Sequence, residues 1–213
     1  MNTVKYNGGS SVFIIGKVVR GGAFAYERDG ENFYEVLIKV ADFETEFMGN
    51  NTLIPVIMSE YLLEKMQTYE GEQISVNCCL HSYAKKTEDG HSRLNVEIRA
   101  RYLDPGGNQK DSIIVSLVGY LCKPPIVKKK ADGEMLVSAL LSVERDGRSD
   151  ISDYIPFIVK DAFAEKLCEL PVGEKICGIG VMKGCASEEN LANKEELTIF
   201  ITNFIKYPTK PQG

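Results

Sequence analysis

The chain has 213 residues, of which 44% are hydrophobic and 26% charged, a composition typical of a globular protein with one large domain or two small ones. The net charge of −5 argues against binding to phosphate through bulk positive charge, so basic groups that contact nucleic acid would have to be grouped locally. No apolar run approaches the ~20 residues that cross a bilayer, and the N-terminus lacks the features of a secretory signal, so we expect a cytoplasmic protein without membrane contact.

In chain order, most of the first half of the chain alternates between apolar and polar residues. The alternation is clear at residues 34–40, 74–80 and 94–100, and a period of two predicts half-buried strands. Residues 59–66 differ, because their apolar residues have helical spacing and Gly71 follows as a possible stop. Together with the apolar run at residues 12–19, these segments predict three strands, one helix and two strands in that order.

The second half of the chain repeats this order with an offset of 101 to 103 residues. Gly16 recurs as Gly119, Ile54 as Ile155, and residues 94–98 as residues 197–201. A spacing kept over about ninety positions indicates a duplicated unit. We predict a first domain at residues 1–103, a linker rich in turn formers at 104–112, a second domain at 113–207 and a short tail at 208–213.

Five strands with one helix between the third and the fourth, in about 95 residues, are typical of the oligonucleotide/oligosaccharide-binding (OB) barrel, a Greek key. A ferredoxin-like unit would need two helices, and the sequence offers no second one in either half. The predicted fold is therefore all-β, with one short helix per unit, in two tandem five-stranded OB barrels.

Two segments resemble the bacterial single-stranded DNA-binding proteins. Residues 113–145 resemble the start of that family's barrel, with a first strand ending at Gly119, a hairpin closed by Gly133 and an apolar second strand ending at Arg145. Residues 71–103 resemble its fourth and fifth strands. The resemblance implies a protein that binds single-stranded DNA with little sequence preference, in replication, recombination or repair.

The chain also departs from that family. It has no tryptophan, although family members commonly stack bases on one. The segment 207–213 lacks the long tail with an acidic tip that recruits replication and repair proteins, which puts such recruitment in doubt more than DNA binding.

Single strands are held by basic groups along the phosphates and by aromatic rings under the bases, and OB barrels present both on strands two and three and in the 1–2 and 4–5 loops. The basic and aromatic residues of these segments are the expected DNA contacts: Lys17, Arg20, Phe24, Tyr26, Arg28, Phe33, Tyr83, Lys85, Lys86, Arg93, Lys123, Lys128, Lys129, Lys130 and Arg145.

Each of these residues also has a structural interpretation. The triplet at 128–130 could be a solvated turn, Tyr26 and Tyr83 could cap the barrel, and Phe24 and Phe33 could belong to the core. Arg99 and Arg101 share the outward face of one strand with Glu97, so ion pairing competes with DNA contact there.

The sequence offers no parts for an enzyme, a metal site or a cofactor. It has no phosphate loop or nucleophile elbow, and its six cysteines lack ligand spacing, so we expect reduced core thiols. His81 and His91 are expected to be structural or exposed, and Asp150 and Asp153 to be solvated in a loop. The alternative function is a tandem OB protein that binds other proteins, such as a primosomal or mobile-element accessory subunit.

The resemblance further implies a homodimer with four barrels. Leu37 and Leu140 occupy equivalent, outward positions of the two second strands, which suggests that this face packs against another barrel. The alternative is a monomer whose two units cover each other around an internal pseudo-twofold axis.

Overall fold

The structure is a computed structural model that describes residues 9–41, 51–66, 71–86, 89–129, 133–145, 148–184 and 197–207. The first barrel consists of β1 (Gly9–Arg28), β2 (Glu31–Ala41), β3 (Asn51–Ser59), α1 (Glu60–Met66), β4 (Gln73–Lys86) and β5 (Ser92–Pro105). The second barrel consists of β6 (Ser112–Leu121), β7 (Ile126–Lys129), β8 (Met135–Arg145), β9 (Arg148–Lys160), α2 (Asp161–Cys168), β10 (Lys175–Lys183) and β11 (Thr198–Lys206).

Each barrel has the strand order of an OB fold. In the first, β1 pairs with both β2 and β4, and the sheet continues from β2 through β3 and β5 back to β4. In the second, β6 takes the place of β1, with β8, β9, β11 and β10 following in the same order. Short parallel contacts, Ile57 with Arg99 and Ile158 with Phe200, close the two barrels. The predicted fold, two five-stranded barrels with one short helix each, is confirmed.

Alternation of side chains accounts for the strands. In β4, residues Ile74, Val76, Cys78 and Leu80 are buried in the core while the residues between them face outward, except at Cys79. Each fully buried aliphatic side chain of this kind stabilises the fold by about 1.5–3 kcal/mol. The second barrel differs at one place: β1 runs unbroken through the 1–2 hairpin, whereas Pro124 and Pro125 separate β6 from β7, because proline cannot donate to a strand ladder.

One detail of the predicted repeat is wrong. Arg99 and Phe200 are the equivalent residues of β5 and β11, because each pairs with the same position of the closing strand, Ile57 or Ile158. The offset between β5 and β11 is therefore 101, not 103, and Ile98 corresponds to Ile199. A slip of two residues leaves every side chain on the same face, so the hydrophobic pattern could not reveal it.

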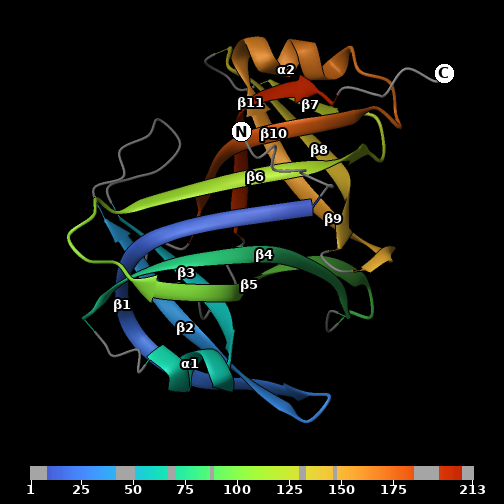
Figure 1. Ribbon diagram of the computed structural model, residues 1–213. Helices are drawn as coiled ribbons and strands as arrows, with labels where there is room; N and C mark the ends of the chain where they lie inside the picture. The colour runs from blue at the N-terminus through green and yellow to red at the C-terminus, as the bar shows by residue number, and fades with distance from the viewer. Residues whose placement is uncertain are drawn as a thin grey trace, which may run out of the picture.

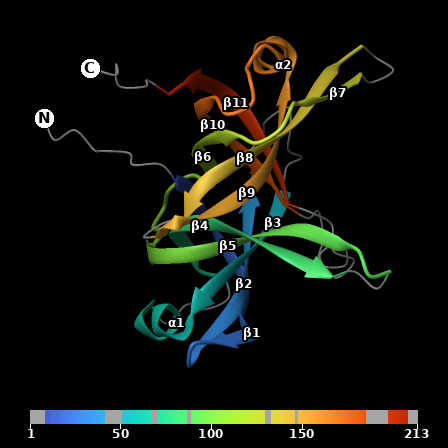
Figure 2. The ribbon, with the colours of Figure 1, turned by 90° about the vertical axis from the view of Figure 1, so that its right-hand side faces the viewer.

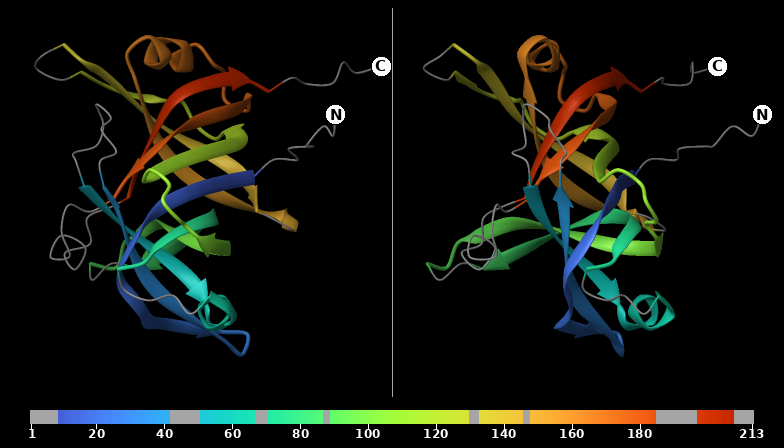
Figure 3. Two further views of the ribbon diagram at one scale, coloured as in Figure 1. Left: turned by 60° about the vertical axis from the view of Figure 1, so that its left-hand side comes forward. Right: turned by 90° about the vertical axis from the view of Figure 1, so that its left-hand side faces the viewer.

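The two barrels share one continuous sheet. Strands β1 and β6 pair antiparallel, with Val12 opposite Val115, so that β5, β4, β1, β6, β10 and β11 lie side by side (Figure 1). Val115 is the counterpart of Val12 at the offset of 103, and the pair therefore lies on a pseudo-twofold axis. The helices α1 and α2 accordingly lie at opposite ends of the molecule (Figure 3).

The expectation that Leu37 lies uncovered on an outward face is wrong. Leu37 is completely buried, and Leu140 is half-buried. A partner barrel is therefore not needed to cover Leu37, and an interface with a second copy has to be sought elsewhere.

Candidate nucleic-acid interface

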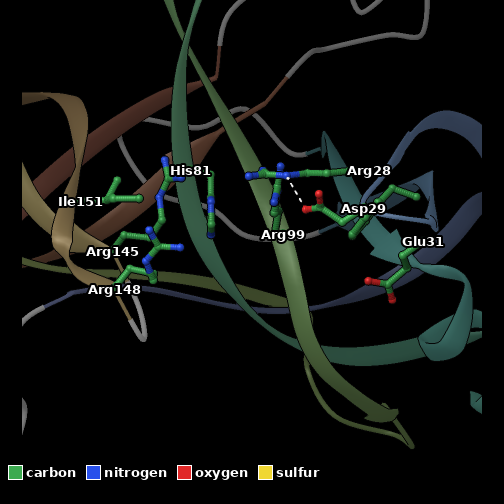
Figure 4. A pocket seen from close by; sticks show the side chains of 9 residues that line it. Arg28, Asp29, Glu31, His81, Arg99, Arg145, Arg148 and Ile151 are labelled. Carbon is green, nitrogen blue, oxygen red and sulfur yellow. Dashed lines mark ion pairs between the residues drawn. The ribbon is translucent and has the colours of Figure 1, made fainter.

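A groove runs between the two barrels. It consists of two pockets of about 320 and 410 Å³, which share Arg28, His81, Arg99 and Arg145 in their linings. One wall comes from the β1–β2 hairpin, β4 and β5 of the first barrel, and the other from β8 and β9 of the second. Figure 4 shows Arg145, Arg148 and Ile151 on one side, Arg28, Asp29 and Glu31 on the other, and His81 and Arg99 between them.

The wall of the first barrel carries aromatic rings. Tyr26 and Phe33 face each other across the hairpin and stack, with ring centroids 5.2 Å apart and an interplanar angle of 30°. The guanidinium of Arg99 lies 5.8 Å from the Tyr26 centroid and 5.6 Å from that of Phe33. Tyr83, on β4, is 46% exposed in the same groove. These flat faces are the kind on which bases of a single strand stack.

A tight turn connects the two strands of the β1–β2 hairpin, which forms part of this wall. Asp29 and Gly30 have φ of 55° and 81°, and an Asp-Gly pair with positive φ at both positions gives the tight, twisted turn that hairpins favour. Arg28 precedes this turn and lies 3.5 Å from the Asp29 carboxylate (Nε to Oδ2).

Glu97 connects the hairpin to β5. The Tyr26 hydroxyl donates to the Glu97 carboxylate at 3.2 Å, and Arg99 forms an ion pair with the same carboxylate. Burial raises the pKa of Tyr26, and the charge of Glu97 raises it further. The ion pairing considered for Arg99 is present, and the same side chain also lines the groove.

The wall of the second barrel is built on a buried carboxylate. Asp153 is 1% exposed and accepts hydrogen bonds from the Arg145 guanidinium at 2.6 and 2.9 Å and from the Ser82 amide of β4 at 2.7 Å. Burial alone would raise the pKa of Asp153, but the bonds from Arg145 and Ser82 outweigh it and hold the pKa below its usual value. These bonds hold Arg145 in the groove lining, and the bond from Ser82 to Asp153 joins the two barrels. The expectation that Asp153 is solvated in a loop is wrong.

Exposed charges complete this wall. Arg148 lies 3.0 Å from Asp150 (Nε to Oδ1), and both side chains are mostly exposed. The Tyr154 amide donates to the Ser82 hydroxyl at 2.7 Å, a further bond between the barrels.

His81 lies at the floor of the groove. Its Nδ1 is buried, with no hydrogen-bond partner among the described residues. Burial lowers the pKa of His81 to about 4; Arg99, Arg145 and Arg28 also lower it, and Asp153 opposes them. The ring is therefore neutral at pH 7. The sequence analysis expected a structural or exposed histidine, and the structure places His81 half-buried in the groove lining.

Charges in the groove balance. Its lining contains four arginines, Arg28, Arg99, Arg145 and Arg148, and four carboxylates, Glu27, Asp29, Glu31 and Glu97. The groove therefore offers oriented guanidinium groups and flat rings rather than a strong positive field.

The structure brings together only some of the expected contacts. Tyr26, Arg28, Phe33, Tyr83 and Arg145 line the groove. Phe24 is not a core residue, because it is 63% exposed, and it forms a T-shaped ring pair with Tyr34 outside the groove. Arg20 pairs with Glu35 at 2.5 Å, also outside it.

The remaining expected contacts that the structure describes are exposed and are not part of the groove lining. Lys85, Lys86 and Arg93 are exposed on the β4–β5 hairpin beyond Tyr83, and Lys17 is exposed on β1. The β7–β8 hairpin, with Lys128 and Lys129, projects from the end of the molecule opposite the β1–β2 hairpin (Figure 2). Lys123 is exposed before β7, and Lys130 lies outside the described residues.

Sequence reasoning missed His81 and Arg148 as groove residues and left Arg99 open between ion pairing and DNA contact. Arg99 had a detectable signal, because it alternates outward on a strand next to the 4–5 hairpin. Arg148 had none, since it reaches the groove only through the contact between the barrels.

No protein-family model matches the sequence, and no curated protein matches it. Solved structures do match. Wild-type single-stranded DNA binding protein from Thermus aquaticus superimposes with a TM-score of 0.75 at 18% identity, over 97% of this chain and 96% of that one. A deletion mutant of the same protein gives a TM-score of 0.75 at 19% identity, over 97% of this chain and 98% of the other. At such low identity the likeness shows the tandem-barrel fold.

Two further observations concern the described part of the chain. None of its helices has the length and apolar character that crossing a membrane requires. Within the same residues, no three His, Cys, Asp or Glu side chains are grouped as a metal-binding set.

Proposed function

We propose that this protein is a non-catalytic, cytoplasmic protein that binds single-stranded DNA with little sequence preference, in replication, recombination or repair. The observation that carries the proposal is the groove, in which Tyr26, Phe33 and Tyr83 lie beside arginines contributed by both barrels. The fold likeness to a protein described as single-stranded DNA binding adds support. Residues 1–103 and 113–207 act in this proposal as two barrels joined by the linker 104–112.

Binding combines two physical contributions. Stacking of a base on an aromatic ring contributes about 1–3 kcal/mol and tolerates any base, because every base has a flat face. Ionic contacts to phosphates release counterions and make affinity depend on salt. Because the groove has balanced charge, the exposed lysines of the hairpins supply most of the second contribution: Lys85, Lys86, Lys128 and Lys129.

Titration of thymidine oligomers at several salt concentrations tests the proposal. Each neutralised phosphate contributes about −0.7 to the slope of log K against log salt. Replacing Lys85 and Lys86 by Ala should make the slope shallower by about 1.4, whereas Tyr83→Leu should weaken binding at an unchanged slope. Absence of binding at low salt, or affinity independent of both changes, contradicts the proposed function.

A protein-binding function is the alternative, favoured by the balanced charge of the groove. A tandem OB subunit that binds another protein would show no affinity for thymidine oligomers at low salt, so the same titration separates the two.

We also infer that two chains form a homodimer through the outer face of the shared sheet. Phe13, Tyr102, Ile114, Ile179 and Ile205 point outward there, and we call them the outer-sheet patch. Phe13 lies directly opposite Ile114, and all members except half-buried Phe13 are at least 45% exposed. A run of large apolar side chains on a sheet face is typical of a subunit interface.

A further inference from the structure

The two walls of the groove differ in chemistry. Every aromatic residue of the lining, Tyr26, Phe33 and Tyr83, belongs to the first barrel. The second barrel contributes Arg145, Arg148 and Ile151, which include no ring. A strand lying between these walls meets aromatic rings on one side only, and on the other side the guanidinium groups of Arg145 and Arg148.

We propose that the groove holds single-stranded DNA in one orientation about its own axis, with bases against the first barrel and phosphates against the second. The inference rests on the proposed function and assigns the roles within it. Phe33 and Tyr83 are base-contacting residues, and Arg148 contacts the backbone together with Arg145.

The geometry of the first wall fits bases. The pair Tyr26–Phe33 is fixed by stacking, by the 3.2 Å hydrogen bond from Tyr26 to Glu97, and by Arg99 over both rings. Rings held in this way lose little side-chain freedom when a base docks, and the Arg99 guanidinium adds a second flat surface. Arg99 on this wall has a largely buried carboxylate partner in Glu97, which limits its use for phosphates.

The geometry of the second wall fits phosphates. Arg145 is held by both oxygens of Asp153, and Arg148 is exposed and pairs with the exposed carboxylate of Asp150. An ion pair between two exposed side chains contributes little, so a phosphate can replace Asp150 at small cost. A guanidinium binds phosphate oxygens in a bidentate manner.

This arrangement is not repeated across the pseudo-twofold axis. The strand pairings place Leu136 at the position of Phe33, Phe200 at that of Arg99, and Thr52 at that of Asp153. Among the described residues the counterpart therefore lacks both the stacked pair and the buried carboxylate with its arginine. The described part of the chain thus forms one groove of this kind, and a strand in it lies between the two barrels on one side of the molecule.

Two modified oligomers separate the walls. Fluorescence anisotropy of the full chain would compare a thymidine oligomer with the same oligomer carrying alternate abasic sites, and with one carrying alternate uncharged methylphosphonate linkages. On the natural oligomer, Phe33→Leu should weaken binding about fivefold or more, and Arg148→Ala about threefold. On the abasic oligomer only the Arg148→Ala effect should persist, and on the methylphosphonate oligomer only the Phe33→Leu effect.

Controls keep the outcome decisive. Tyr61→Ala removes an exposed ring of α1, and Lys206→Ala removes an exposed cation that pairs with Glu174; each should change affinity less than twofold on all oligomers. Tyr83→Leu repeats the test of the first wall if Phe33→Leu lowers the melting temperature. The wall assignment alone is overturned if the wild type binds but the Phe33→Leu effect persists on the abasic oligomer and the Arg148→Ala effect on the methylphosphonate oligomer. It is also overturned if both modifications abolish the effects of both variants. No wild-type binding to the natural oligomer overturns the proposed function as well.

Discussion

At the residue scale, buried Asp153 pairs with Arg145 and also accepts a hydrogen bond that joins the two barrels. Asp153 accepts bonds from Arg145 of its own barrel and from the Ser82 amide of the other. Removing one member of a buried ion pair leaves the charge of the other without its partner where water solvates it poorly, and this lowers the stability of the fold.

Asp153→Asn is therefore expected to lower the free energy of unfolding by about 3 kcal/mol. Asp150→Asn is the matched control, because it removes a carboxylate paired with an arginine on the same strand, but at an exposed site. Urea unfolding followed by circular dichroism measures both. Similar losses for the two variants would show that burial of Asp153 does not decide its contribution.

The pKa of His81 predicts a pH dependence of stability. The folded chain holds this pKa at about 4, below the ordinary value of 6.5. Between these values the unfolded chain binds a proton that the folded chain does not, so the free energy of unfolding falls as pH decreases from 6.5 toward 4. His81→Gln should flatten this dependence in urea unfolding at a series of pH values.

His91→Gln is the control for that prediction, since His91 is the only other histidine and is exposed at a hairpin. The low pKa of Asp153 acts in the same direction at lower pH, below 3.8. A His81→Gln chain with the wild-type dependence between pH 4 and 6.5 would contradict the assignment.

Residue patterns predicted part of the groove. Tyr26, Phe33 and Tyr83 were identifiable because aromatic residues near OB hairpins suggest stacking. The burial of Asp153 was not predictable, because it depends on Ser82 of the other barrel, 71 residues away. Local sequence carries no information about such a partner.

At the element scale, strands and helices followed from periodicity, and the repeat gave the order of both barrels. The joining of β1 to β6 did not follow, because an edge strand pairs through backbone groups that leave no pattern in the side chains. The error of two residues in aligning β11 with β5 has a related cause. Alternation of apolar and polar residues determines which face of a strand is buried, but a shift of two residues keeps the same alternation.

The repeated glycines of β1 and β6 have a packing role. A Cβ at Gly16 would lie 2.5 Å from the Lys39 carbonyl oxygen, and one at Gly119 would lie 2.4 Å from that of Ser142. Gly16→Ala and Gly119→Ala should each lower the free energy of unfolding by about 1–3 kcal/mol, because the backbone of the neighbouring strand must move.

Gly21→Ala is the control on the same strand, since a Cβ added at Gly21 would meet no atom within 4 Å. Thermal unfolding of the three variants measures the difference. A Gly21→Ala loss equal to those of Gly16→Ala and Gly119→Ala would point to strand flexibility rather than close approach as the cause.

At the scale of the whole molecule, the shared sheet determines which surface remains for a second chain. The β1–β6 pairing already satisfies one edge of each barrel, so the internal pseudo-twofold arrangement expected as an alternative is present. It leaves the outer-sheet patch uncovered. Leu37 lies buried within a single chain, so its replacement would test folding rather than assembly.

Dimerisation through the outer-sheet patch makes a direct prediction about mass. In a twofold dimer the same patch of both subunits forms the interface, so each substitution occurs twice in it. Ile114 and Ile179 are 45% and 50% exposed, and Glu at both positions should therefore leave the barrel cores intact while placing like charges in the contact. Light scattering at micromolar concentration should give about twice the 23.7 kDa chain mass for the wild type and one chain mass for the double variant Ile114→Glu, Ile179→Glu.

Val172→Glu, at an exposed apolar residue outside the patch, should keep the wild-type mass. A wild-type mass of one chain rules out the dimer, and a dimer that survives the double variant assigns its interface to another surface.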